Sequence, residues 1–409
     1  MQSNVLKMLG WFYIAIGLFC NPWVLGRLGF TEGKVYWTRS LVIIGVFDAV
    51  VLALGILCLS KRKAELTTNL SLLLWSTVIF TFPLGEMFIR AGITLNVKQL
   101  KHPGLYADGQ SDIDYWKLYA DWGGQFKCDP PDRVHPLLGW TQGNVTPTNP
   151  LGLKPVTKSR LDSPNPKIFF YGDSFVRGVS NVEFEIPNYI NRKINGREVV
   201  DFSMGGYGLD QVYLMFKETH QKADHPLVLV GILVSDDIDR TVLSIRTSKK
   251  PYFTIDAKGA LQLNRVPIER DHANDCHSFP LSIKSYMLAF VKQTLLRGDN
   301  KVELKQQISS RILDHFKAEA DQAQAKLVFV LFYVQDNLTQ MDWRDTFVKA
   351  QLSRLGMPYI DTRDILLQYA KDQHVELSSF YKLGEGHHNN LGNEVISKGI
   401  LKYLSKIYH

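Results

Sequence analysis

The distribution of apolar residues divides the chain into an apolar N-terminal part and a mixed remainder. The run 40–60 (SLVIIGVFDAVVLALGILCLS) and the run 70–89 (LSLLLWSTVIFTFPLGEMFI) each have the length of about 20 residues that a helix needs to cross a bilayer. A weaker run, 8–28, is interrupted by an Asn-Pro pair. We predict three transmembrane helices over these runs, which together form a membrane anchor at residues 1–90.

The basic residues of the short loops predict how the anchor is oriented. The loop between the second and third runs begins with Lys61, Arg62 and Lys63, whereas the cations of the preceding loop are spread out beside Glu32. Because short cytoplasmic loops carry an excess of Lys and Arg, this contrast favours a cytoplasmic N-terminus. We therefore predict a multi-pass protein of the cell inner (plasma) membrane, whose C-terminal domain is extracytoplasmic (periplasmic).

Two acidic residues lie inside the apolar runs, where an unpartnered charge is costly. Asp48 is near the middle of the run 40–60, so it needs Arg39 or another helix as a partner, or a water-lined path for protons or substrate. Glu86 is close to the end of the run 70–89, where its carboxylate can reach the interface. Pairing or interface exposure explains both residues more simply than a transport role.

Beyond the anchor, short apolar runs alternate with helical patterns, which is typical of a parallel sheet with helices on both faces. Helices are expected at 184–195, at 209–222 and at the C-terminal end, 391–407. The five predicted strands are 167–171, 198–203, 226–234, 326–334 and 357–362.

The same alternation sets the domain boundaries. The α/β domain covers residues 166–409, with an insertion at about 240–283 that interrupts the strand-helix rhythm and is a candidate lid. Residues 91–165 lack clean periodicity and are interpreted as a connecting and covering region. In open parallel sheets chemistry gathers at the carboxyl ends of the strands, so polar residues that directly follow strands are the candidates for function.

Composition and charge narrow the classes of function. The chain has 409 residues and a formal charge of +7, but no basic stripe with interleaved aromatic residues, so nucleic acid is not an expected partner. Cys128 and Cys276 form no CxxC pair and no metal-ligand spacing. In an oxidising compartment they could form a disulfide, which the sequence leaves open.

A serine follows the first predicted strand. In YGDSFVRG (171–178), Gly172 permits a tight turn, and Ser174 then lies at the carboxyl end of the strand, before a helix. There the Ser174 backbone N–H is free to act as an oxyanion donor. A helix-capping Asp and Ser would give the same Gly-Asp-Ser triplet, so this signal is weak by itself.

Two further polar segments follow strands. In DFSMGGYGLDQ (201–211), Gly205 and Gly206 would let a backbone N–H approach a substrate, or would form a plain turn; the GK[ST] and GxGxxG patterns of phosphate loops do not occur there. In VSDDIDR (234–240), Asp236 and Asp237 are candidates for a metal or acid pair, or for helix-capping acids.

A histidine pair precedes the last predicted helix, in GEGHHNNLGNEVI (384–396). His387 is well placed to be a general base, and Glu385 could orient its ring. A zinc site is a poor interpretation, because the adjacent side chains of His387 and His388 diverge and no HExxH or Cys partners occur. A pair of surface histidines is the alternative.

Together, these blocks resemble the SGNH/GDSL hydrolase superfamily over about residues 165–409. The surrounding GDSFVRGVSN and GGYGLDQ, with the upstream HPLLGW and NPLG, are similar to a bacterial membrane-anchored subgroup. The resemblance implies the SGNH hydrolase fold, a three-layer α/β/α unit with a flavodoxin-like parallel sheet.

The resemblance also implies roles for individual residues. Ser174 is the nucleophile, His387 is the general base, and Glu385 takes the place of the Asp that the family usually has before its His. The oxyanion hole would use the backbone N–H groups of Ser174 and Gly206 and the side chain at Asp236. No metal or organic cofactor is implied.

Asp236 departs from the family, which usually has Asn at this position. An ionised carboxylate cannot donate a hydrogen bond, and its charge opposes an oxyanion. Three outcomes are open: Asp236 is protonated in a dry site, another group donates instead, or the domain is weak or inactive.

The sequence thus supports two hypotheses. The first is a membrane-anchored serine esterase or O-acyltransferase that acts on an acyl ester of a cell-envelope glycan or lipid. The second is a catalytically weak or inactive SGNH-like module that binds an envelope polymer or a membrane acyltransferase partner.

Overall fold

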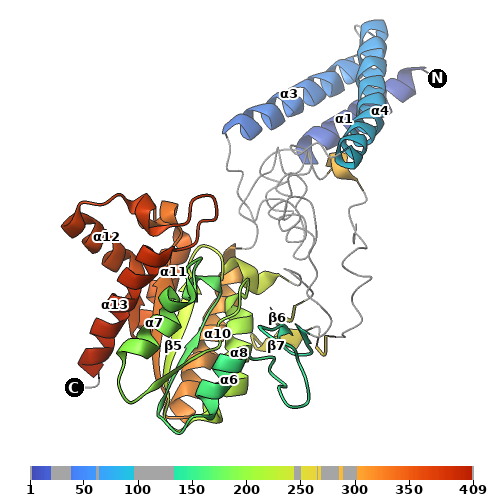
Figure 1. Cartoon of the computed structure of the whole chain (residues 1–409). Helices are drawn as coiled ribbons and strands as arrows, with labels where there is room; N and C mark the ends of the chain where they lie inside the picture. Colours follow the sequence, from blue (N-terminus) through green and yellow to red (C-terminus); the bar gives the residue numbers. More distant parts are fainter. Residues whose placement is uncertain are drawn as a thin grey trace. The chain divides into compact units, whose positions relative to one another are not determined.

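The structure is a computed structural model in which the chain forms two compact units (Figure 1). The helical unit comprises Met1–Phe126 and Ser278–Val302, and the α/β unit comprises Lys127–His277 and Glu303–His409. Within them, the residues that the structure describes are 2–19, 38–60, 64–95, 133–243, 250–264, 266–268, 285–288 and 302–407.

Three apolar helices make up most of the described helical unit. They are α1 (Gln2–Phe19), α3 (Thr38–Ser60) and α4 (Ala64–Thr94). The predicted runs 40–60 and 70–89 fall within α3 and α4, while the end of the run 8–28 lies outside the described residues. One described helical stretch, Glu65–Gly92, is long and apolar enough to cross a membrane, and the apolar stretches of α1 and α3 are shorter.

Glycines bring α1 and α3 into close contact. A Cβ built at Gly10 would lie 3.0 Å from the Gly55 carbonyl oxygen, so only glycine lets the two backbones approach this closely. Asp48 of α3 is buried, and its Oδ1 has no hydrogen-bond partner among the described residues. Glu86 of α4 is partnered, because it accepts hydrogen bonds from the backbone N–H groups of Tyr286 and Met287 within the same unit.

The α/β unit is built on a five-stranded parallel sheet, as the sequence predicts. Its order, β4-β3-β5-β8-β9, is the flavodoxin-like order, with the first strand of the sheet, β3, second from one edge. All residues of β3 and β5 are buried, because helices cover both faces of a parallel sheet. The strands are β3 (Lys167–Tyr171), β4 (Glu198–Asp201), β5 (Leu227–Leu233), β8 (Lys326–Phe332) and β9 (Tyr359–Asp361).

Helices cover the sheet in two groups. On one side α7 contacts α13, which in turn contacts α12. On the other side the rings of Tyr213 in α8 and Phe316 in α10 are 5.2 Å apart, and Ser310 of α10 donates a hydrogen bond to Gln351 of α11. The helices are α7 (Ile186–Lys193), α8 (Leu209–Thr219), α10 (Val302–Gln322), α11 (Trp343–Arg354), α12 (Thr362–Gln373) and α13 (Asn390–Ile407). Single-turn helices are η4 (Ser174–Val176), η5 (Val182–Phe184), η6 (His220–Lys222), η7 (Asp239–Val242), η8 (Gln335–Leu338) and η9 (Leu377–Phe380).

The segment just before β3 belongs to the α/β unit, whereas the sequence suggested a connecting region up to residue 165. It contains the short antiparallel strands β1 (Val134–His135) and β2 (Gly139–Trp140), followed by α6 (Pro155–Asp162). Helix α6 is fixed to the edge strand β4, where Arg160 donates a hydrogen bond to the Val199 carbonyl oxygen. Leu138 and Trp140 are part of the main core.

The described part of the insertion 240–283 packs beside α8. Its two strands, β6 (Tyr252–Ile255) and β7 (Leu261–Asn264), form an antiparallel hairpin. The buried Lys250 amine forms an ion pair with Asp210 and donates hydrogen bonds to two main-chain carbonyl oxygens. Cys128 and Cys276, the pair for which a disulfide was left open, lie outside the described residues.

Candidate active site

Ser174 stands at the carboxyl end of β3, on the sharp turn that the sequence predicts. Gly172 has a φ of 148°, and a Cβ built there would lie 2.5 Å from a methyl carbon of Val176, so the turn requires glycine. The Asp173 carboxylate accepts a hydrogen bond from the Phe175 N–H at 2.7 Å and caps η4. No described residue accepts a hydrogen bond from the Ser174 N–H.

The Ser174 hydroxyl contacts the ring of His387. The distance between Ser174 Oγ and His387 Nε2 is 2.8 Å. On the other side of the ring, His387 Nδ1 lies 3.2 Å from the Glu385 carbonyl oxygen, which can only accept a hydrogen bond. This contact puts the proton on Nδ1 and leaves Nε2 as the acceptor for the Ser174 hydroxyl.

Glu385 therefore contacts His387 differently from the sequence expectation. Its backbone carbonyl oxygen is near the ring, while its exposed carboxylate makes no hydrogen bond or ion pair with any described residue. The turn around Gly384 and Gly386, both with positive φ, bends the main chain back toward the imidazole. The carbonyl oxygen can fix the ring tautomer, but it lacks the full negative charge with which a carboxylate stabilises an imidazolium.

The glycine turn after β4 passes directly beside the serine. A Cβ built on Gly205 would lie 3.8 Å from Ser174 Cβ. Gly206 has a φ of 80°, and the Tyr207 N–H donates a hydrogen bond to the Met204 carbonyl oxygen, which closes the turn. The N–H groups of Gly205 and Gly206 have no acceptor among the described residues.

Asp236, at the end of β5, forms an ion pair with Arg240. Its Oδ2 is 2.8 Å from Arg240 Nη2, and its side chain is 40% exposed. A guanidinium at this distance favours the charged form of the carboxylate, and a carboxylate anion can only accept hydrogen bonds. Of the three outcomes left open by the sequence, protonation of Asp236 is the one that this geometry disfavours.

The strand order, the position of Ser174 and its contact with an imidazole 213 residues later all match one group of enzymes. The chain resembles the SGNH/GDSL hydrolases. We call the α/β unit the SGNH-like domain below.

Solved structures similar to the chain include esterases and acylhydrolases. One is a two-domain esterase active on acetylated mannans, with 11% identity and a TM-score of 0.36; the match covers 62% of this chain and about half (52%) of that one. A member of the lipolytic G-D-S-L family from Veillonella parvula has 13% identity and a TM-score of 0.34, over 58% of this chain and 96% of that one. An acetylxylan esterase from Geobacillus stearothermophilus has 13% identity and a TM-score of 0.35, over 59% and 95%.

No protein-family model and no curated protein sequence matches the chain. The structural similarities have low identities and low TM-scores.

Arg240 joins three parts of the SGNH-like domain in its interior. Its Nη1 lies 2.9 Å from Asp173 Oδ2, 2.8 Å from Asp237 Oδ1 and 2.9 Å from the Tyr207 carbonyl oxygen. Burial alone would lower the pKa of the guanidinium, but the surrounding carboxylates raise it above its usual value. Burial, and then the nearby charge of Asp173, raise the pKa of Asp237.

His388 is the buried neighbour of the candidate base. Both of its ring nitrogens lack a hydrogen-bond partner among the described residues, and its ring packs against Phe175 and Tyr381. Burial, followed by repulsion from His387, lowers the pKa of His388 to about 3. His388 is therefore a neutral packing residue.

Main-chain and side-chain hydrogen bonds join the histidine loop to the serine loop. The Val179 N–H donates a hydrogen bond to the His388 carbonyl oxygen at 2.8 Å, and Asn393 Nδ2 donates to the Arg177 carbonyl oxygen at 2.6 Å. A Cβ built at Gly178 would lie 2.6 Å from the His388 carbonyl oxygen, so the two loops approach as closely as glycine allows. These contacts fix the position of the Ser174 loop relative to the His387 loop.

Sequence reasoning missed several of these supporting residues. Arg240 was visible only as the end of VSDDIDR, and Trp140 as the end of HPLLGW. Asn393 follows the histidine pair at the start of α13, but nothing in its spacing indicated a bond to the serine loop. Gly178, the second glycine of GDSFVRG, was the one signal in the sequence of a close contact between the serine loop and the histidine loop.

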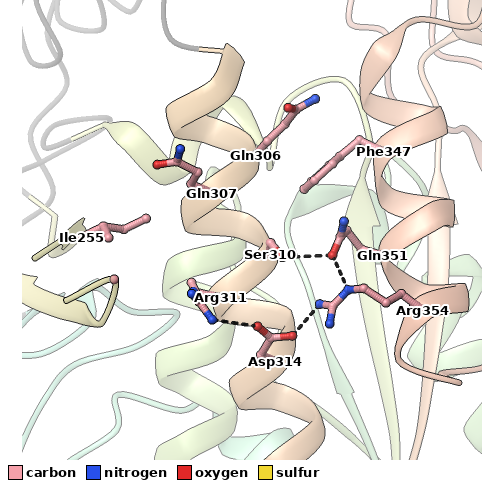
Figure 2. Close-up of a pocket in the computed structure, with 10 residues that line it drawn as sticks. Ile255, Gln306, Gln307, Ser310, Arg311, Asp314, Phe347, Gln351 and Arg354 are labelled. Carbon is pink, nitrogen blue, oxygen red and sulfur yellow. Dashed lines mark hydrogen bonds and ion pairs between the residues drawn. The ribbon is translucent and has the colours of Figure 1, made fainter. Parts of the chain in front are cut away.

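A separate hollow of about 700 Å³ lies between α10 and α11 (Figure 2). Its polar side chains largely satisfy one another: Gln351 Oε1 accepts hydrogen bonds from Ser310 and Arg354, and Arg354 also pairs with Asp314. It contains no Ser-His contact, and no metal-binding group of three or more His, Cys, Asp or Glu side chains occurs in the described part of the chain.

Proposed function

We propose that the protein is a membrane-anchored serine esterase or O-acyltransferase that acts on an acyl ester. The observation that supports this proposal most strongly is the 2.8 Å contact between Ser174 Oγ and His387 Nε2, with the Glu385 carbonyl oxygen as an acceptor beside the opposite ring nitrogen. A hydroxyl that donates to a neutral imidazole is the arrangement that activates serine as a nucleophile.

The proposed chemistry proceeds in two transfers. Ser174 Oγ attacks the ester carbonyl carbon while its proton passes to His387 Nε2, and free main-chain N–H groups receive the oxyanion. The imidazolium then gives that proton to the departing alcohol oxygen, which leaves an acyl-enzyme. Water or a sugar hydroxyl attacks the acyl carbon, its proton goes to His387 and then to Ser174 Oγ, and the product is an acid or a new ester.

The membrane anchor motivates a cell-envelope glycan or lipid as the acyl carrier. Helices α1, α3 and α4 expose large apolar side chains, which include Trp11, Phe80 and Phe88 at 65–70% exposure. Such surfaces are costly in water and stable in hydrocarbon. With the orientation favoured by Lys61, Arg62 and Lys63, the SGNH-like domain is proposed to lie on the periplasmic side of the inner membrane.

Replacement of the nucleophile tests the proposal. The purified full-length chain is expected to hydrolyse an activated acetyl ester, and Ser174→Ala is expected to abolish turnover while the melting temperature stays unchanged. Ser353→Ala, at an exposed serine of α11, serves as the matched control and retains activity. Equal turnover by wild type and Ser174→Ala would end the assignment.

A second candidate function is favoured by the Asp236–Arg240 ion pair. An anion at this position opposes the oxyanion, and loss of one oxyanion donor costs about 10²–10³ in rate. In this second proposal the domain has little or no activity and binds an envelope polymer or a membrane acyltransferase through the same site. The Asp236→Asn variant separates the two candidates.

A further inference from the structure

The glycine turn beside Ser174, which contains Gly205 and Gly206, is hydrogen-bonded to a segment that precedes the sheet in sequence. We call residues 134–142, which contain β1 and β2, the strap. The strap is also fixed to helix α8, because Gln211 of α8 donates a hydrogen bond to the Leu138 carbonyl oxygen at 2.7 Å. Trp140 is 1% exposed and meets the Tyr207 ring edge-on at 5.5 Å. The strap is therefore packed against the glycine turn as part of the folded domain.

The carbonyl groups along the turn have hydrogen-bond donors from several directions. Trp140 Nε1 donates to the Gly205 oxygen at 3.0 Å, and Gln142 Nε2 donates to the Ser203 oxygen. Arg240 Nη1 donates to the Tyr207 oxygen at 2.9 Å. The Met204 oxygen accepts from the Tyr207 N–H within the turn at 3.2 Å. Each peptide plane of the turn is thereby held in one orientation.

Because trans peptides are planar, the direction of each carbonyl group also fixes the direction of the N–H group of the next residue. In a trans peptide the C=O of one residue and the N–H of the next point in opposite directions. Because the Gly205 oxygen points to the Trp140 indole, the Gly206 N–H points away from the strap. The Met204 oxygen points into the turn, so the Gly205 N–H points out of it. Neither N–H has an acceptor among the described residues, and Gly205 lies against Ser174.

We infer that Trp140 is a positioning residue, which aims the Gly206 N–H at the ester oxygen through its hydrogen bond to the Gly205 carbonyl. This inference rests on the proposed function of Ser174. It also explains how an oxyanion can be stabilised while Asp236 is engaged in an ion pair with Arg240. With no side-chain donor from Asp236, the orientation of the main-chain donors decides how well the oxyanion is stabilised.

The variant Trp140→Phe tests this inference, because it removes the indole N–H and keeps an aromatic ring. The full-length enzyme is assayed for kcat and KM on an activated acetyl ester, and for inhibition by an acetyl trifluoromethyl ketone that forms an oxyanion at Ser174. We expect kcat to fall by about tenfold to a hundredfold, KM to change by less than about threefold, and ketone affinity to fall as much as kcat, because only the transition state loses stabilisation.

Gln211→Met is the matched control, since it removes a buried hydrogen bond of the strap that does not touch the turn. It is expected to lower the melting temperature and leave kcat unchanged. If Trp140→Phe keeps the wild-type kcat, or if both variants lose kcat in proportion to their melting temperatures, Trp140 does not position the donor. Those results would leave the proposed function of Ser174 intact. The proposed function fails separately, if Ser174→Ala hydrolyses the ester as fast as the wild type.

Discussion

At the scale of single residues, His388 shows how the site tolerates a buried polar group beside the candidate base His387. The ring is enclosed by Phe175, Phe332 and Tyr381, and neither nitrogen has a hydrogen-bond partner in the described part of the domain. Burial lowers its pKa to about 3, against an ordinary value of 6.5. The unfolded chain therefore binds a proton at His388 between these two values, and the folded chain does not.

This difference predicts how stability depends on pH. Because the unfolded state binds more protons, the contribution of His388 to the free energy of unfolding falls as the pH drops from about 6.5 toward 3, by about 1.4 kcal/mol per pH unit. His388→Leu should remove this part of the slope in urea unfolding measured from pH 7 to pH 5. His315→Gln, at an exposed histidine of α10, is the control that keeps the wild-type slope. Parallel slopes for wild type and His388→Leu would contradict the account.

The individual site residues differ in how well the sequence predicts them. Ser174 and His387 were identified from their places after a strand and before the last helix, and the structure brings their side chains together. The contact of His387 with the Glu385 carbonyl oxygen was not foreseeable, because it depends on the φ angles of Gly384 and Gly386 and not on side-chain chemistry. A motif specifies side chains, while main-chain donors and acceptors become visible only in three dimensions.

At the scale of elements, one buried guanidinium links the serine turn, the glycine turn and the end of β5. Arg240 contacts Asp173, Asp237 and the Tyr207 carbonyl oxygen inside the domain, and Asp236 at its edge. Loss of one partner from a buried ionic network costs about 3–5 kcal/mol, so Arg240 itself is a poor site for a functional test. Asp236 is half-exposed, and its removal leaves the two buried carboxylates in place.

Asp236→Asn is therefore the informative change at this junction. It removes a negative charge and supplies an amide that can donate a hydrogen bond, and we expect kcat to rise by about tenfold to a hundredfold. Asp372→Asn, at an exposed residue of α12, controls for the change of charge. A gain from no measurable activity would favour the second candidate function. A loss of activity with unchanged stability would contradict the view that Asp236 opposes the oxyanion.

The elements themselves were predictable where they are long and regular. Strands such as β5 and β8 are continuous apolar runs because both faces of the sheet are covered, and the sequence located them within a residue or two. The strap was not predictable, since β1 and β2 have two residues each and show no periodicity. Its place beside the glycine turn depends on contacts between residues about 65 positions apart, such as Trp140 and Gly205.

At the scale of the whole molecule, the two units differ in the surface that they expose. Among the described residues, the large exposed apolar side chains are concentrated in α1, α3 and α4, whereas those of the SGNH-like domain are mostly buried in one core. The sequence distinguished the two parts because a membrane helix and a covered parallel strand have different lengths of apolar run. The membrane anchor itself, its number of crossings and the periplasmic orientation stay predictions.

Covalent labelling of Ser174 tests the central claim most directly. Spheroplasts that express the full-length chain are treated with a charged, membrane-impermeant fluorophosphonate, and the modified peptide is identified by mass spectrometry. We expect phosphonylation at Ser174 in intact spheroplasts, and a loss of about a hundredfold or more in labelling rate for His387→Gln, because the serine then lacks its base. Labelling that appears only after detergent would contradict the orientation. No labelling of Ser174 in folded protein with or without detergent, or equal rates for wild type and His387→Gln, would contradict the activated serine itself.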